Sequence, residues 1–133
     1  MNSVMGARVA LWTGAEENLG TVEKGLVEMG CSVHCVDSFE DLWRLVESDI
    51  DLVVVNCRSA AEILFWMNGV RRAGQTTPPV LTFATALDME EYLHAMAMGA
   101  FDCVGLPVQD NELQRLVSRA MEHRQTEPLL LHS

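Results

Sequence analysis

The residues best placed to do chemistry stand at the end of one apolar run, Asp51-Leu-Val-Val-Val-Asn56. Four consecutive apolar residues after an acid are typical of a short strand that is buried on both faces of a parallel sheet. In such sheets the functional residues gather at the carboxyl ends of the strands. Asn56 holds that place, but its amide carries no charge and is a poor nucleophile. The run therefore predicts a site position without a reactive group.

Thiols are the other candidate reactive groups, and the chain has four, at Cys31, Cys35, Cys57 and Cys103. Strand alternation would place Cys31 and Cys35 on one face of a strand and send His34 to the opposite face. No CxxC spacing is present. We interpret the cysteines as reduced, buried small apolar residues, in preference to a metal-binding or redox pair.

Composition limits the function classes. The chain has 133 residues, enough for one compact domain, and 19 acids against 9 Lys and Arg give a net charge of -10. That charge disfavours binding to nucleic acid and to anionic membranes. No apolar run reaches the roughly 18 residues of a membrane span, and residues 1–8 lack the pattern of a signal peptide. We expect a cytoplasmic protein that binds neither nucleic acid nor membrane.

Motifs for other chemistry are missing from the sequence. It contains no GxGxxG, P-loop, GxSxG or HExxH pattern, and residues 14–20 are too acidic for a phosphate cradle. We predict no enzyme activity, no cofactor and no metal.

Ten elements must position these residues. Helical spacing of apolar residues predicts helices over 16–29, 39–47, 62–72, 88–98 and 110–123. Apolar runs between them predict strands over 8–13, 32–36, 51–56, 80–84 and 101–104. Ser38 is the expected N-cap of the second helix, and Gly30 and Gly99 are expected to end the first and fourth helices. The alternation indicates an open parallel α/β sheet with right-handed crossovers.

The ends of the chain are linker-like in composition. We expect a disordered start over residues 1–6, one domain over 7–123, and a tail over 124–133 in which Pro128 interrupts any helix. The tail could be a linker to a downstream effector domain.

The stretches Pro79-Val-Leu-Thr-Phe-Ala-Thr85 and Ala95-Met-Ala-Met-Gly-Ala-Phe-Asp-Cys-Val-Gly-Leu-Pro107 carry a family resemblance. They resemble the fourth strand, fourth helix, fifth strand and final loop of response-regulator receiver domains, and the resemblance covers residues 7–123. It implies a flavodoxin-like, CheY-like (βα)5 three-layer sandwich, whose five-stranded parallel sheet has the order 2-1-3-4-5.

The same resemblance implies where the phosphorylation site would lie. Receivers phosphorylate an aspartate at the end of the third strand, with Mg²⁺ held by an acidic pair, a hydroxyl on the fourth strand and a late lysine. The corresponding residues here are Thr13 and Gly14 for the pair, Asn56 for the acceptor, Ala84 for the hydroxyl and Leu106 for the lysine. All five are replaced, so the resemblance implies a degenerate pseudo-receiver without aspartyl phosphorylation.

Nearby residues do not restore the site. Strand alternation turns Thr85 away, and Glu16 and Glu17 are better placed to complement a helix dipole. Cys103 replaces the Tyr or Phe that switches in receivers, and the loop expected at residues 58–61 lacks the usual Met-Pro-Gly pattern.

A receiver-like domain that has lost its phosphorylation site is expected to act by binding a partner. Receivers use their fourth helix, fifth strand and fifth helix for this, so we predict a protein partner or a homodimer there, with Tyr92, His94 and Cys103 as candidate contacts. Three apolar residues of the fourth helix are expected to pack on the sheet instead. They are Met89, Leu93 and Met96.

Aromatic residues complete the prediction. Trp12 is expected in the core beside the degenerate site, and one of Phe65 and Trp66 is expected to be exposed.

An alternative function is a small-ligand switch for a nucleotide or flavin, or a vestigial enzyme. It would use an apolar pocket around Trp12, Ala84 and Leu106.

Overall fold

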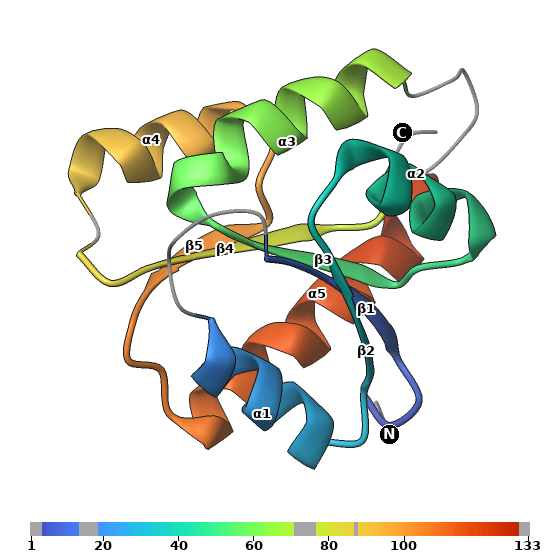
Figure 1. The fold of residues 1–133 in the computed structure, drawn as a ribbon, viewed down its shortest axis with the longest axis vertical. Helices are drawn as coiled ribbons and strands as arrows, with labels where there is room; N and C mark the ends of the chain where they lie inside the picture. The colour runs from blue at the N-terminus through green and yellow to red at the C-terminus, as the bar shows by residue number, and fades with distance from the viewer. Residues whose placement is uncertain (1–3, 14–18, 71–76, 87, 131–133) are drawn as a thin grey trace.

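The computed structural model describes residues 4–13, 19–70, 77–86 and 88–130, with side chains throughout except at 70 and 124–130. Five parallel strands form one sheet in the order β2-β1-β3-β4-β5, as predicted (Figure 1). The strands are β1 (Arg8–Trp12), β2 (Ser32–Val36), β3 (Leu52–Asn56), β4 (Val80–Ala84) and β5 (Asp102–Gly105). The helices are α1 (Gly20–Glu28), α2 (Phe39–Ser48), α3 (Cys57–Val70), α4 (Met89–Ala97) and α5 (Asp110–Leu130).

The two apolar runs of the sequence form the buried centre of the sheet. Every residue of β3 and β4 is buried, because helices cover both faces of these strands. The acid that precedes β3 has a structural role, since the Asp51 carboxylate accepts a hydrogen bond from the Arg8 N–H at 2.9 Å. This bond fixes the start of β1 beside β3.

Helices cover the sheet in two layers (Figure 1). α1 and α5 pack against one face, around a core that includes Leu26 and Leu113, and α2, α3 and α4 pack against the other face, around a core that includes Leu42 and Ile63. Among the described residues, no helix is both long and apolar enough to cross a membrane.

Most local signals at the helix ends behave as predicted. Ser38 Oγ accepts a hydrogen bond from the Asp41 N–H at 3.2 Å and caps α2. Asp88 was expected to be the first residue of the fourth helix, but it is the N-cap of α4, and its Oδ1 accepts from the Glu90 N–H at 2.7 Å. Gly99, which follows α4, has a φ of +108°, a conformation that side chains disfavour.

Several predicted boundaries differ from those of the structure, most of them by one residue, and three differences matter more. α3 begins at Cys57 rather than at residue 62, so residues 58–61 are helical and not a loop. α5 continues past Pro128 to Leu130, although a proline has no N–H to donate to the preceding turn. Val4, which was expected in a disordered start, is buried against the core of the α1 and α5 face.

Because α1 packs closely against α5, a glycine-to-alanine substitution should have opposite effects on stability at Gly25 and at Gly69. A Cβ at Gly25 would lie 2.7 Å from Leu113 Cδ2, whereas a Cβ at Gly69 would meet nothing within 4 Å. Gly25→Ala should lower the free energy of unfolding by about 1–3 kcal/mol through overpacking. Gly69→Ala should raise it by up to about 1 kcal/mol through helix propensity. Urea unfolding of both variants measures this, and changes of the same sign would contradict the packing described.

Candidate functional site

Asn56 caps a helix. It ends β3, its side chain is 1% exposed, and its Oδ1 accepts a hydrogen bond from the Ser59 N–H at 2.8 Å. Asparagine is among the best N-cap residues, and α3 begins at the next residue, Cys57. The Asn56 Nδ2 is buried and has no hydrogen-bond partner among the residues that the structure describes. The position that the family resemblance assigns to the phosphoacceptor is thus held by a neutral capping amide.

The other described positions that the resemblance assigns to a phosphorylation site supply no charge. The Thr13 hydroxyl donates to the Val36 carbonyl at 3.1 Å, toward β2. Ala84 is buried, and its carbonyl accepts from the Leu106 N–H at 2.7 Å. Gly14, with the neighbouring Glu16 and Glu17, lies outside the described residues. A carboxylate cluster that could hold Mg²⁺ is therefore missing from the described part of the site.

Aromatic rings fill the space beside the end of β1. Trp12 is buried and its ring lies 5.4 Å from that of Phe39, which lies 5.2 Å from Trp66. Trp66 in turn packs edge-on against Trp43 at 5.9 Å. Trp12 belongs to the core under α2, α3 and α4, whereas Leu106 packs on the opposite face of the sheet. The apolar ligand pocket of the alternative hypothesis would need both residues, and the sheet separates them.

Behind Asn56 lies a short chain of hydrogen bonds between two thiols and a hydroxyl. The Cys57 S–H donates to Thr82 Oγ1 at 3.5 Å, and the Thr82 hydroxyl donates to the Asp102 carbonyl at 3.3 Å. The sulfurs of Cys57 and Cys103 lie 2.7 Å apart. Because Cys57 has only one proton to donate, Cys103 must be the donor in this last contact.

The environment of Cys57 favours its protonated form. Burial raises the pKa of the Cys57 thiol to about 12. Cys57 is therefore a neutral thiol at physiological pH.

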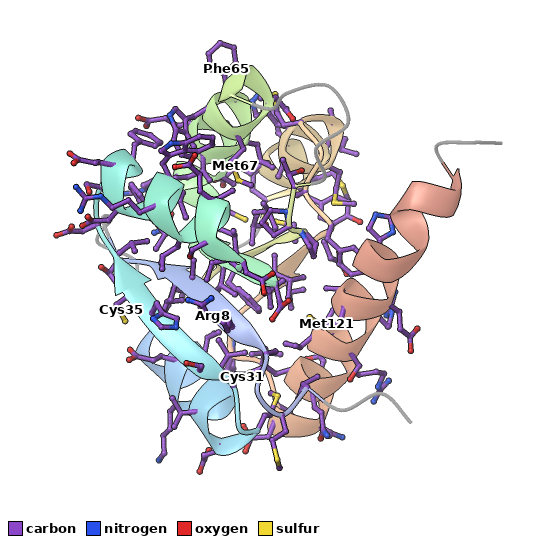
Figure 2. The ribbon with its side chains drawn as sticks, turned by 90° about the vertical axis from the view of Figure 1, so that its right-hand side faces the viewer. Arg8, Cys31, Cys35, Phe65, Met67 and Met121 are labelled. Carbon is purple, nitrogen blue, oxygen red and sulfur yellow. The ribbon has the colours of Figure 1, made fainter. Side chains whose placement is uncertain are left out.

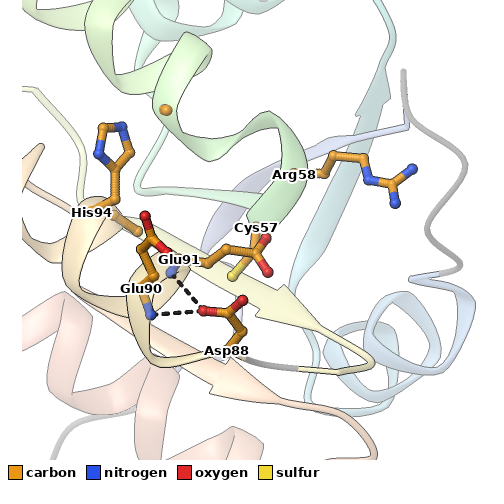
Figure 3. A pocket seen from close by; sticks show the side chains of 8 residues that line it. Cys57, Arg58, Asp88, Glu90, Glu91 and His94 are labelled. Carbon is orange, nitrogen blue, oxygen red and sulfur yellow. Dashed lines mark hydrogen bonds between the residues drawn. The ribbon is translucent and has the colours of Figure 1, made fainter.

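A cavity of about 350 Å³ opens between the first turns of α3 and α4 (Figure 3). Three of its eight lining residues carry carboxylates, and the Arg58 side chain points away from it in this view. Within the described parts of the chain, no three potential metal ligands cluster. The lining residues are Cys57, Arg58, Ala61, Asp88, Glu90, Glu91, His94 and Ala95.

The surface of α4 differs from the prediction. Met89 and Leu93 were expected to pack on the sheet, but their side chains are 70% and 58% exposed. Only Met96 of that set packs against the core. Because residues at i and i+4 adjoin on a helix, Met89 and Leu93 form an apolar surface on α4.

Two of the three predicted partner contacts are accessible. Tyr92 is half-buried and His94 is exposed at the cavity. Cys103 is buried against Cys57, so its side chain is not offered to a partner in this structure.

Two further predictions concern side chains that Figure 2 labels, Phe65 and the pair Cys31 and Cys35. Phe65 is 73% exposed and points away from the fold, while Trp66 packs inward, so the expectation of one exposed aromatic is confirmed. Cys31 is buried as expected, but Cys35 is exposed because β2 is an edge strand. The basic pair at residues 71–72 lies outside the described residues.

Known protein structures identify the fold. The chain superposes on full-length FixJ from B. japonicum with a TM-score of 0.75 over 93% of its length, at 17% identity. It matches the receiver domain of the sensor histidine kinase PA1611 from Pseudomonas aeruginosa PAO1 with a TM-score of 0.70 over 88%, at 18% identity. The fold is that of a response-regulator receiver domain. HP1043, an orphan response regulator of H. pylori, has the highest identity of these three, 28% over 89% of the chain, with a TM-score of 0.62.

The comparisons have clear bounds. No protein-family model matches the chain, and no curated protein matches it significantly. The chain spans 62% of full-length FixJ, 98% of the PA1611 receiver domain and 95% of HP1043. The PA1611 receiver holds a magnesium ion in its active-site cleft. Thr13, Asn56 and Ala84 offer such an ion no carboxylate, so the described residues of this receiver fold do not fit it.

Proposed function

We propose that this chain is an atypical receiver module of a bacterial two-component signalling or transcription-regulation system. It acts through protein–protein contacts and needs no aspartyl phosphorylation. The observation that carries the proposal is Asn56, whose buried amide oxygen caps α3 where a receiver would present its nucleophile. An amide cannot form an acyl phosphate, and capping gives it a structural role that does not depend on a phosphoryl group.

The partner surface that we propose lies on α4, β5 and α5. Met89 and Leu93 supply adjacent exposed apolar side chains on α4, and Tyr92 and His94 lie on the same helix. Methionine adapts its shape to different partners, which suits a contact surface. The occupant is a second copy of this chain or a partner protein, which could include an effector domain joined to it.

Self-association through this surface should depend on its apolar residues and not on phosphodonors. Met89→Ser with Leu93→Ser should weaken dimerisation about 10-fold or more, because two apolar side chains would no longer be buried in the interface. Sedimentation velocity over a concentration series, with and without acetyl phosphate and Mg²⁺, measures this.

The matched control for that experiment is Val27→Ser. Val27 lies on α1 and is 55% exposed, close to the exposure of Leu93, but it is outside the proposed surface. It should leave association unchanged. Assembly that requires the phosphodonor would contradict the proposed function, and a monomer at every concentration would leave a different protein as the partner.

A further inference from the structure

Two cysteines that are distant in sequence meet at the carboxyl edge of the sheet. Cys57 begins α3 and Cys103 lies in β5, 46 residues further along the chain, yet their sulfurs are 2.7 Å apart. Non-bonded heavy atoms usually pack at ~3.5–4.0 Å. A disulfide bond is ~2.05 Å long, so bond formation requires the sulfurs to approach by roughly 0.7 Å. The fold therefore holds this pair close to bonding distance.

The two thiols differ in their access to small molecules. Cys57 is half-buried and lines the cavity of about 350 Å³ between α3 and α4, so a small oxidant can reach its sulfur (Figure 3). Cys103 is buried behind it, next to Thr82. This arrangement gives the two residues separate roles, with Cys57 as the thiol that the peroxide oxidises first and Cys103 as the resolving thiol.

We propose that Cys57 and Cys103 form a reversible redox modification site for hydrogen peroxide. The Cys57 sulfur attacks one peroxide oxygen, the O–O bond breaks, and the thiol proton passes to the other oxygen, which leaves as water while Cys57 becomes a sulfenic acid. Because burial raises the pKa of Cys57, only its small deprotonated fraction reacts, so the rate increases with pH. Cys103 then attacks the Cys57 sulfur, an S–S bond forms, and the sulfenic oxygen leaves as a second water with the Cys103 proton. Two thiols lose two electrons in total and one peroxide is reduced to two waters.

The bond would join the start of α3 to β5 across the intervening strand β4. It would also remove the S–H that Cys57 donates to Thr82. Reversible, redox-sensing disulfides are the kind found in reducing compartments, and a reducing thiol restores the pair. This site follows from the contact between the two thiols and not from the proposed function, so either proposal can fail without the other.

The other two cysteines provide an internal control. Cys31 and Cys35 are four residues apart along an extended segment, which separates them by roughly 13 Å. They cannot bridge within the folded chain. Cys35 is exposed and therefore meets the oxidant as readily as Cys57 does.

The test uses the full reduced chain and hydrogen peroxide. After oxidation the remaining thiols are alkylated in denaturant and the chain is analysed by intact mass and peptide mapping. We expect one cross-linked peptide pair that contains Cys57 and Cys103, loss of two alkylation sites of the four, and full recovery after dithiothreitol. The same cross-link should form in Cys35→Ser and be lost in Cys103→Ser, whose hydroxyl can still donate to Cys57.

Several results would overturn the proposal. One is that Cys57 and Cys103 stay reduced while Cys35 is oxidised. Another is that Cys57 proceeds to sulfinic acid without a cross-link. A third is that the cross-link appears equally in protein unfolded by urea. If Cys103→Ser does not fold, the Cys35→Ser chain and the urea comparison still decide between these results.

Discussion

Replacing Asn56 with aspartate should lower the free energy of unfolding by about 3 kcal/mol at pH 7. One carboxylate oxygen can still accept from the Ser59 N–H, but the other would lie where the Asn56 Nδ2 now has no partner among the described residues. No described cation lies at the site, since Leu106 replaces the lysine and Arg58 is exposed. The substitution that would recreate a phosphoacceptor therefore buries an uncompensated charge.

The loss should depend on pH with a definite sign. Burial raises the pKa of the new carboxyl group in the folded state above the value of ~3.9 in the unfolded state. Stability should equal that of the parent below about pH 3.9 and fall as the pH rises, until it levels off above the folded-state pKa. Urea unfolding between pH 4 and pH 8 measures this.

A matched control separates burial from charge in that experiment. Asn111→Asp adds the same charge at an exposed residue of the first turn of α5, so stability should change by less than about 0.5 kcal/mol. Equal stability of Asn56→Asp and parent at pH 7, or a gain with Mg²⁺, would show that the site still holds a cation.

Truncating Trp12 should have the largest effect of any change near the degenerate site. Trp12→Ala should cost about 3–5 kcal/mol, because the ring is buried and leads the aromatic series through Phe39 and Trp66. Trp12→Phe should cost only about 1 kcal/mol, since the Trp12 Nε1–H has no partner in the described part of the chain and no hydrogen bond is lost. Chemical unfolding of both variants measures the difference. A phenylalanine variant as unstable as the alanine variant would contradict this, because it would reveal a hydrogen bond to the indole.

Sequence patterns predicted the sheet well because its central strands are mostly apolar runs. The runs 51–56 and 80–84 had no plausible reading except buried strands, and the structure places both in the centre of the sheet. The start of α3 was missed because the helical pattern of apolar residues becomes regular only later. Asn56 was the missed signal, since asparagine directly before a helix is a preferred cap.

Predicting the contacts at the site required the strand order and the helix packing as well as the sequence pattern. Met89 and Leu93 have the spacing of a buried stripe, and only the packing of Ala95 and Met96 shows that α4 turns a different face to the core. The contact between Cys57 and Cys103 depends on the strand order, in which only β4 lies between β3 and β5. The predicted strand order already contained that information, whereas spacing along the sequence brings together only Cys31 and Cys35.

Phosphotransfer is the most direct test of the central claim that this receiver fold works without aspartyl phosphorylation. The full chain is incubated with acetyl phosphate and Mg²⁺ and then weighed intact, beside a receiver with an unaltered acidic pair. We predict that the control gains one phosphoryl group and that this chain gains none. A stoichiometric adduct that hydroxylamine removes would contradict the account, because it would show an acyl phosphate on a carboxylate of this chain.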